Sequence, residues 1–540
     1  MSRARRITRS TEFDVVVVGS GASALAAALS ASIQGASVVV LEKSAKYGGS
    51  SALSGGQLWI PNNEFEQEAG IKDSKSSTLL YLKRLTLGRV DTKLIESFVE
   101  NAPRALDFLV EKTLLRPKLR EDLPDYHPEW PGASKGGRTL DPGLFDGLLL
   151  GSEFKHLRQN PQYHTDGGIH TTSLEFEKIM RGEEVPELRR RKPTTLSFGE
   201  ALIGSLRKAL FDRRVPLLLE HRATRLLTDR RRVMGVVARA RKTTRTIWAK
   251  LGVILAAGGF EWNLSMKKRY LQAPSENSAG CDTNTGDGIR MGTGVGATTA
   301  LMDEAWWFTL LLRPNDKRGW LVTSERTLPG SIMVNRAGKR FANESMNYND
   351  LTKVMLLVNP ETYERDNIPS FLIFDSNHRR KYWFVNTPPG RPAPRWVASA
   401  DSIRGLASKL RINIDNLETT VKRFNQFVAD GFDPEFHRGR GLYDRHWGDP
   451  SARNPTLGKI SEPPFYGIRL LAGDIGTKGG LLTDHKGQVL DSGNKPIPGL
   501  YAAGNNAASV MGPGYAASGA TLGPCITFGY LAGIYVVQNG

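Results

Sequence analysis

The glycine-rich turn Gly19–Ala24, with the sequence GSGASA, constrains the fold of this chain more than any other stretch. Before it, Asp14–Val18 is a mainly β-branched run, which indicates a parallel strand buried on both faces. After it, Leu25–Gln34 has a helical pattern and is followed by a second apolar run, Ser37–Leu41. Strand, glycine turn, helix and strand in this order predict the first βαβ unit of a Rossmann-like sheet.

The residue types in this turn suit a dinucleotide. Gly19 allows the tight turn, Gly21 lets backbone N–H groups approach a pyrophosphate, and Ala24 allows close packing of helix on strand. The positive end of the helix dipole then faces the phosphates. Glu42 follows the second strand, where a carboxylate accepts hydrogen bonds from a ribose hydroxyl. We therefore expect a dinucleotide at this site.

Downstream segments favour FAD over NAD. Lys43–Gly56 is rich in glycine and serine, and we expect a flexible segment that runs along an extended flavin cofactor. It contains no histidine, so FAD is expected to be noncovalent. The apolar runs Val253–Phe260 and Leu500–Asn505 read as strands that return to the same sheet from distant parts of the chain.

The returning strands predict an α/β fold in which a discontinuous Rossmann-like FAD-binding domain carries an insertion. We expect the FAD-binding domain over residues 1–300 and 473–540, and the insertion over residues 301–472. Several large apolar residues near the first junction are candidate walls of an apolar slot, and core packing explains them equally well: Trp306, Trp307, Phe308, Leu310 and Leu311.

Charge and cysteine content exclude other classes of protein. The net charge of +18 arises from 73 Lys and Arg against 55 Asp and Glu, with basic runs at Arg189–Lys192, Arg230–Arg232 and Arg379–Lys381. We interpret these runs as solvated faces and expect no nucleic acid, because no stacking aromatics are interleaved with them. Contact with an anionic membrane surface stays an alternative. Two cysteines and nine scattered histidines predict no metal site and a reducing, cytoplasmic compartment.

Five motifs carry a resemblance to a known family. They are Asp125–Glu129 (DYHPE), Asn284–Gly288 (NTGDG), Gly338–Glu344 (GKRFANE), Gly473–Gly480 (GDIGTKGG), and Gly504-Asn505 through Tyr515–Pro524. On these motifs the sequence resembles the FAD-dependent fumarate reductase/succinate dehydrogenase superfamily, and within it the 3-ketosteroid Δ1-dehydrogenases. The resemblance covers nearly the whole chain. It implies that the insertion, residues 301–472, is an α+β catalytic domain that caps the substrate.

The tyrosines separate this chain from the fumarate reductases. Where those enzymes carry a catalytic arginine, a relay arginine and a histidine, this chain has Tyr515, Tyr348 and Gly476. A site that has lost these charges and gained phenols is unsuited to a dicarboxylate. It suits a neutral ketone on a large apolar substrate.

The resemblance implies a role for each of four residues. Tyr515 hydroxyl and Gly519 N–H hold the C3 oxygen of a 3-ketosteroid, Tyr348 takes the C2 proton, and Tyr126 is hydrogen-bonded to Tyr348. Hydride passes from C1 to N5 of FAD, which introduces a C1–C2 double bond, and an external acceptor such as a quinone reoxidises the flavin. The alternatives are dehydrogenation at another ring position (4-ene formation), a non-steroid cyclic ketone as substrate, and a catalytically silent flavin-binding protein.

The motif and the resemblance together assign a set of residues to the FAD site. They are Gly19, Gly21, Ser23, Ala24, Glu42, Lys43, Gly49, Ser50, Ser54, Gly55, Gly56, Ala223, Ala257, Gly258, Asp287, Gly504, Asn505, Ala520 and Leu522.

Two apolar stretches have explanations other than a signal peptide or a membrane span. Phe13–Ile33 lies behind the basic Met1–Arg9 and superficially resembles a signal peptide, but its removal would delete the βαβ unit. Gly514–Val537 is free of charge and long enough to cross a bilayer. In a fold of this family it forms a final helix that crosses the protein interior, so we expect no transmembrane segment.

Overall fold

The computed structural model describes residues 10–164, 168–241, 243–271 and 276–540, and it contains an eight-stranded sheet. Met1–Arg9 lies outside the described residues. The main path of the sheet runs β20 (Gln488–Leu490), β21 (Pro496–Ala502), β11 (Thr243–Leu255), β1 (Ser10–Val18), β2 (Val38–Leu41) and β8 (Leu217–Leu218), with β9 (His221–Asp229) and β10 (Arg232–Ala240) paired beside β11. β1 pairs in parallel with β2 and β11, which confirms the predicted unit and the return of a distant strand.

Steric constraints explain why small residues occupy both ends of the glycine turn. Gly19 has φ 113°, and a Cβ there would lie 2.2 Å from the carbonyl oxygen of Ala256, so only glycine fits. Helix α1 (Ala22–Ile33) begins directly after Gly21, so the predicted start at Leu25 was wrong. Small residues fill its first turn, and the amide of Leu25 already donates to the Gly21 carbonyl at 3.0 Å.

Two strand boundaries and the structure of one segment also differ from the prediction. The strand expected over Val253–Phe260 ends at Leu255, and the one expected over Leu500–Asn505 ends at Ala502, because glycine-containing turns follow both. Lys43–Gly56 is not a flexible segment: Gly49–Leu53 forms the short helix α2. Ser51 on this helix accepts a hydrogen bond from the amide of Ala22 at 3.0 Å, so tertiary contact overrides the weak helix propensity of glycine and serine.

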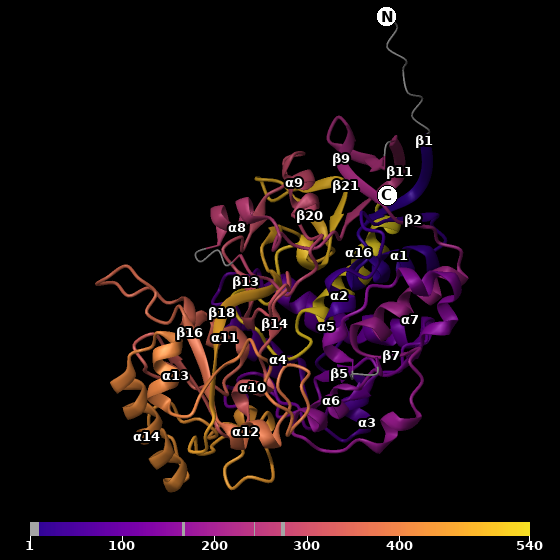
Figure 1. Ribbon diagram of the computed structural model, residues 1–540. Helices are drawn as coiled ribbons and strands as arrows, with labels where there is room; N and C mark the ends of the chain where they lie inside the picture. The colour runs from indigo at the N-terminus through magenta and orange to yellow at the C-terminus, as the bar shows by residue number, and fades with distance from the viewer. Residues whose placement is uncertain (1–9, 165–167, 242, 272–275) are drawn as a thin grey trace, which may run out of the picture.

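A second, six-stranded antiparallel sheet lies beside the first. Its order is β14 (Trp320–Leu321), β13 (Ala305–Leu311), β18 (Phe465–Thr477), β16 (Ser370–Phe374) and β15 (Ser331–Asn335), with β17 (Ala398–Ala400) paired to β18. Figure 1 shows the orange segment with α11 (Tyr348–Leu356), α13 (Ile403–Leu410) and α14 (Ile414–Asp430) around this sheet, away from the sheet that contains β1. This confirms the predicted fold class. The division at residues 472 and 473 stays a prediction, and β18 runs through it as one strand.

The remaining elements fill the space around the two sheets (Figure 1). They are the helices α3 (Glu64–Glu68), α4 (Lys75–Thr86), α5 (Thr92–Lys112), α6 (Ser173–Met180), α7 (Phe198–Asp212), α8 (Leu264–Tyr270), α9 (Asp287–Thr293), α10 (Ser324–Thr327), α12 (Ser376–Lys381) and α15 (Leu442–His446), and the short strands β3 (Leu58–Trp59), β4 (Lys118–Leu119), β5 (Thr139–Asp141), β6 (Phe145–Asp146), β7 (Thr195–Leu196), β12 (Thr299–Ala300) and β19 (Gly480–Leu481).

The apolar C-terminal stretch contains helix α16 (Leu522–Gln538), which packs against α1 and α5. Two glycines allow the close approach to α1: a Cβ on Gly529 would lie 2.4 Å from the Ser23 carbonyl oxygen, and one on Gly533 would lie 2.0 Å from Ser30 Oγ. Ser30 Oγ also donates to the carbonyl of Tyr530 at 3.0 Å. Among the described residues, no helix combines the length and the apolar character needed to cross a membrane.

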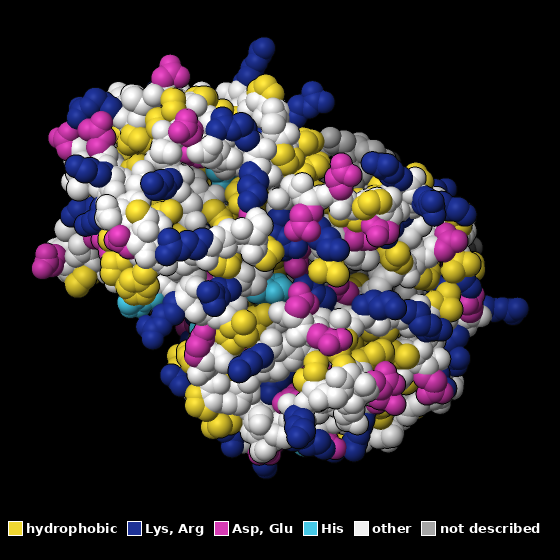
Figure 2. All heavy atoms as spheres, turned by 90° about the horizontal axis from the view of Figure 1, so that it is seen from below, with side chains coloured by type: hydrophobic (Ala, Val, Ile, Leu, Met, Phe, Trp, Pro, Cys, Tyr) yellow, Lys and Arg dark blue, Asp and Glu magenta, His cyan; other side chains and the backbone are white. Residues whose placement is uncertain are grey.

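Basic side chains are spread over the surface. On the face in Figure 2, Lys and Arg are interspersed with Asp and Glu. Arg189, Arg190 and Arg230 are exposed, as expected for solvated runs. Arg379 is an exception, because it is buried and donates to the carbonyls of Tyr382 and Pro388.

Candidate active site

A long cavity begins at the carboxyl ends of β1 and β2 and reaches β13 and α11. It encloses about 1930 Å³ of space between protein atoms, part of it open to solvent. The glycine turn after β1 lines one region, and aromatic side chains that include Phe308, Tyr348 and Tyr515 line another. Sites outside the carboxyl ends of parallel strands are typical of open α/β sheets. The cavity therefore offers adjoining places for a cofactor and a second ligand.

The glycine turn fits a dinucleotide. The amides of Ser23 and Ala24, in the first turn of α1, make no hydrogen bond with any group in the described chain and remain free for an anion. Ser20 Oγ donates to Glu42 at 2.5 Å and the Ser44 amide donates to it at 2.8 Å, which fixes the carboxylate at the cavity wall. Burial raises the pKa of Glu42. Each carboxylate oxygen can accept more than one hydrogen bond, so a hydroxyl-rich ligand can add donors to these two.

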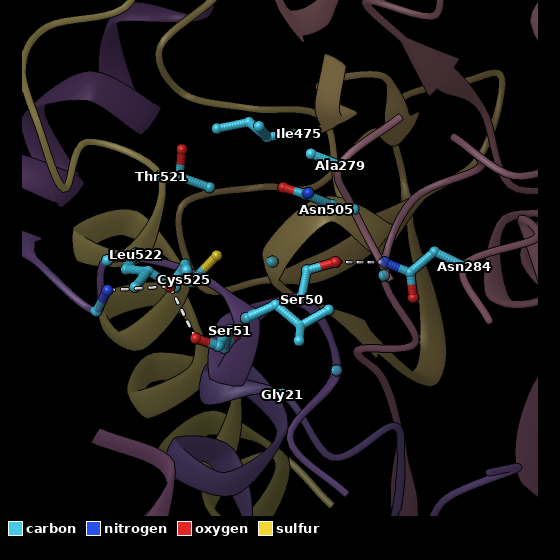
Figure 3. Close-up of a pocket in the computed structure, with 18 of the residues that line it drawn as sticks. Gly21, Ser50, Ser51, Ala279, Asn284, Ile475, Asn505, Thr521, Leu522 and Cys525 are labelled. Carbon is cyan, nitrogen blue, oxygen red and sulfur yellow. Dashed lines mark hydrogen bonds between the residues drawn. The ribbon is translucent and has the colours of Figure 1, made fainter. Parts of the chain in front are cut away.

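The adjoining cradle is built from α2 and a loop before α9. Ser50 Oγ accepts hydrogen bonds from Asn284 Nδ2 at 3.0 Å and from the Cys281 amide at 2.8 Å. Figure 3 shows Ser50 and Asn284 pointing toward each other, with Ala279, Asn505, Ile475 and Thr521 around the space above them. A Cβ on Gly55 would meet nothing closer than 4.0 Å, so the wall is open to a flat ring system there.

Three phenols predicted from separate parts of the sequence come together. Tyr126 hydroxyl donates to Tyr348 hydroxyl at 2.6 Å, and the ring of Tyr515 lies 5.2 Å from Tyr126 and 5.5 Å from Tyr348 between centroids. Tyr348 is the first residue of α11 and stacks on Phe308 of β13 at 4.0 Å. Tyr515 lies in the loop before α16. The inserted segment and the returning segment therefore both contribute to one cluster.

Burial controls the protonation of these phenols. It raises the pKa of Tyr515 and raises the pKa of Tyr126 and of Tyr348 well above the ordinary value. All three are therefore neutral at pH 7, and each keeps its hydroxyl hydrogen. Tyr515 hydroxyl shares a hydrogen bond of 2.8 Å with Thr521 Oγ, and the Gly519 amide donates to no group of the described chain. Gly519 has φ 90° and a Cβ on it would lie 2.7 Å from Trp59 N, so glycine is required.

Lys478 supports the loop of Tyr515 from behind. Its buried Nζ donates to the carbonyls of Pro513 at 2.9 Å and Gly514 at 2.6 Å, and lies 4.6 Å from the centre of the Trp306 ring. Burial lowers the pKa of Lys478 to about 7. Trp306 in turn packs on Tyr515 with centroids 4.7 Å apart. The lysine therefore fixes the backbone that places the phenol.

Most residues predicted for the site line the cavity. Tyr126, Ala24 and Ala520 do not, because Tyr126 lies behind Tyr348 and the two alanines are buried in the hydrophobic core. Those that line it are Gly19, Gly21, Ser23, Glu42, Lys43, Gly49, Ser50, Ser54, Gly55, Gly56, Ala223, Ala257, Gly258, Asp287, Tyr348, Gly504, Asn505, Tyr515, Gly519 and Leu522.

Sequence reasoning missed several lining residues. Ser20 and Thr521 lie inside the glycine turn and the C-terminal motif, next to predicted residues, so these motifs could have identified them. Tyr163 and Arg318 belong to no motif. Of the candidate slot residues, Phe308 lines the cavity, whereas the others are core residues that do not: Trp306, Trp307, Leu310 and Leu311.

A dinucleotide turn that adjoins an aromatic, phenol-lined region is the arrangement expected of a flavoprotein oxidoreductase. The profile of the FAD binding domain family matches residues 14–522. The 3-oxosteroid 1-dehydrogenase of Mycobacterium tuberculosis strain H37Rv is 39% identical over 98% of this chain and 99% of its own. The 4-oxocyclohexanecarboxylate 2-dehydrogenase of Sinomonas cyclohexanicum is also 39% identical, over 97% of this chain and 92% of its own.

A solved structure agrees with these relatives. The crystal structure of 3-ketosteroid Δ1-dehydrogenase from Sterolibacterium denitrificans in complex with 1,4-androstadiene-3,17-dione has a TM-score of 0.93 and 39% identity, and covers 98% of this chain and 100% of its own. The chain belongs to the FAD-dependent 3-oxosteroid 1-dehydrogenase family. The predicted resemblance, FAD as cofactor and oxidoreductase class are thereby confirmed.

Proposed function

We propose that this protein introduces a C1–C2 double bond into the A ring of a 3-ketosteroid. The observation that carries the proposal is the cluster of three phenols, in which Tyr348 and Tyr515 line the cavity beside the free amide of Gly519 and Tyr126 is hydrogen-bonded behind Tyr348. A ring ketone is neutral, and neutral phenols are donors suited to its oxygen.

Tyr515 and Gly519 would hold the C3 oxygen. As charge develops on this oxygen, the hydroxyl and the amide stabilise it, and the C2 hydrogen becomes acidic. Bound FAD supplies an acceptor for the two electrons and the hydrogen that leave C1. Thr521 supports this role, because it shares a hydrogen bond with Tyr515 and orients its hydroxyl.

Tyr348 would take the C2 proton in its ionised form. Its oxygen already receives the hydrogen bond from Tyr126, which stabilises negative charge on Tyr348. Burial raises the pKa of Tyr348, so only a small fraction is ionised at neutral pH. The proposal therefore requires a rate that rises with pH.

Three further parts of the account belong to the same proposal. The chain would divide into FAD-binding and substrate-capping domains near residues 300 and 472, as the two sheets suggest. An external acceptor such as a quinone would take the electrons from the flavin. A cytoplasmic location agrees with two free thiols, Cys281 and Cys525.

A non-steroid cyclic ketone is the second candidate substrate. It is favoured by the relative from Sinomonas cyclohexanicum, which is as similar as the steroid enzymes and is named for a single-ring oxo acid. The same phenol cluster serves either ring, because both substrates present a ketone with hydrogens on the adjacent carbons.

Anaerobic mixing of the FAD-loaded protein with androst-4-ene-3,17-dione tests the proposal. We expect loss of the oxidised flavin absorbance and a product with a new double bond at C1–C2, identified by NMR. Reduction by 4-oxocyclohexanecarboxylate alone would favour the second candidate. A bound flavin that neither ketone reduces would contradict both and leave a catalytically silent flavoprotein.

A further inference from the structure

Arg318 places a positive charge in the cavity that the proposed chemistry does not use. It lies in the connection between β13 and β14, lines the cavity and is half-buried. Its Nε donates to the Ala279 carbonyl at 3.2 Å, and the neighbouring Gly319 amide donates to the Ser278 carbonyl at 3.0 Å. Two bonds to one backbone segment hold this side chain at the cavity wall.

The other cations that line the cavity have carboxylate partners. Lys43 and Arg222 each lie 2.8 Å from Asp287, and the lining carboxylate Glu177 lies 3.0 Å from Arg120. Arg318 forms no ion pair with a described residue; the nearby carboxylate of Asp282, which acts to raise the pKa of Arg318, is paired with Arg158 at 3.7 Å. The terminal nitrogens of Arg318 make no hydrogen bond to a described group, and burial lowers its pKa.

An unpaired guanidinium in such a place is unfavourable without a ligand. Removing a cation from water costs free energy unless an anion or several acceptors replace the water. A guanidinium presents five N–H donors in a planar fork that matches a carboxylate in two-point contact. One donor is in use here, so the terminal nitrogens are free to bind a carboxylate.

Further aromatic side chains line the same cavity as Arg318 and the phenol cluster. Tyr163 lines the same cavity and packs on Phe198 at 4.4 Å and Phe176 at 5.6 Å between centroids. Burial raises the pKa of Tyr163 to about 12, the charge of Arg318 opposes this rise, and Tyr515 adds to it. Tyr163 therefore lies within electrostatic reach of both groups, and an apolar ring system between them would touch these aromatic side chains.

We propose that Arg318 binds a carboxylate on the substrate, at a position separate from the ketone, and so selects ring ketones that carry an acid group. The ketone end of this assignment rests on the function proposed above. A steroid with a carboxylated side chain combines the two features, since its apolar rings suit the aromatic lining and its acid supplies the missing counter-charge.

A matched pair of substrates isolates the charge. 3-Oxoandrost-4-ene-17β-carboxylic acid and its methyl ester differ in the acid group alone. In Arg318→Gln we expect kcat/KM for the acid to fall about 10- to 100-fold, as for loss of a charge-assisted pair, and kcat/KM for the ester to stay within about threefold. Arg318→Lys keeps the charge without the fork and should retain part of the activity on the acid.

Arg313 provides the control variant. It lies in the same connection, is paired with Asp316 at 2.6 Å and does not line the cavity. Arg313→Gln should leave the ratio of acid to ester unchanged. Equal losses on acid and ester in Arg318→Gln, or loss of FAD from that variant, would overturn the proposal, because the arginine would then support the fold or the cofactor.

A binding measurement separates this proposal from the proposed reaction. The 1,4-diene acid and its methyl ester are already dehydrogenated, so their dissociation constants can be measured from the change in flavin absorbance without turnover. We expect the acid to bind about 10-fold or more tightly than the ester, and Arg318→Gln to abolish the difference. If no ketosteroid reduces the flavin but the acid still binds more tightly than the ester, the proposed reaction is refuted and the proposed carboxylate site is supported. Equal affinities in the native protein would refute the site.

Discussion

Replacing Tyr515 by phenylalanine removes one hydroxyl and preserves the packing around it. The ring contacts Trp306, Tyr126 and Tyr348 at centroid distances of 4.7, 5.2 and 5.5 Å, and a phenyl ring keeps all three contacts. The hydrogen bond to Thr521 at 2.8 Å is lost. A typical hydrogen bond contributes about 1 kcal/mol, so the variant should fold and hold FAD.

The effect on rate should be much larger than the effect on stability. If Tyr515 donates to the ketone oxygen as charge develops there, losing it costs about 2.7–4 kcal/mol in the transition state, or roughly 100- to 1000-fold in rate. Thr521→Val keeps the phenol and removes its partner. We expect that control to slow the reaction by less than about tenfold, the cost of one ordinary hydrogen bond.

The assay is anaerobic stopped-flow reduction of the bound flavin by androst-4-ene-3,17-dione. FAD content is measured from the absorbance of the oxidised protein, and folding by circular dichroism. A folded, FAD-loaded Tyr515→Phe protein that reduces its flavin within about threefold of the native rate would refute the donor role of this tyrosine.

Three other changes test separate parts of the account. Tyr348→Phe should almost abolish flavin reduction, and Tyr126→Phe should leave a measurable rate. The native rate should rise with pH, because burial raises the pKa of Tyr348 and only the ionised phenol takes the proton. A native rate that does not depend on pH would count against ionised Tyr348 as the base. The Gly21→Val variant should fold but bind no FAD, because φ is −75° at Gly21 and the added side chain would block the approach to the α1 amides. Normal flavin content in this variant would contradict the assigned role of Gly21. Acid precipitation of the native protein should release its flavin, because the FAD is expected to be noncovalent. Burial lowers the pKa of His378 to about 4, so the unfolded chain binds a proton at a higher pH than the folded chain, and the free energy of unfolding should fall by up to about 3 kcal/mol as pH drops from roughly 6.5 to 4. His378→Gln should reduce this dependence of unfolding free energy on pH, whereas the exposed control His437→Gln should not. Equal pH dependence in the two variants would show that His378 is not the cause.

The nucleotide half of the site could be predicted because each residue type has a local steric reason. Gly19 has a positive φ and lies against the Ala256 carbonyl, where a side chain would clash, and Glu42 is the residue directly after β2. The helix within Lys43–Gly56 could not be predicted from propensity. Its serines are held by partners distant in sequence, as Ser50 is by Asn284.

The aromatic half depended on the resemblance. Nothing in the spacing of Tyr126, Tyr348 and Tyr515 indicates that they meet, because the fold brings them from a loop, the start of α11 and the loop before α16. The roles of Lys478 and Arg318 depend on hydrogen bonds to other segments, such as those to the Pro513 and Ala279 carbonyls. Tertiary contact alone identifies them.

The central claim is that hydrogen leaves the carbons next to the ketone, C2 as a proton and C1 with the electrons. The most direct test is anaerobic flavin reduction by androst-4-ene-3,17-dione carrying deuterium at C1 or at C2. We predict a primary isotope effect from deuterium at C1, and loss of deuterium from C2 to solvent that requires Tyr348. Unchanged reduction by the C1-deuterated steroid, together with deuterium lost from another ring position, would contradict the account.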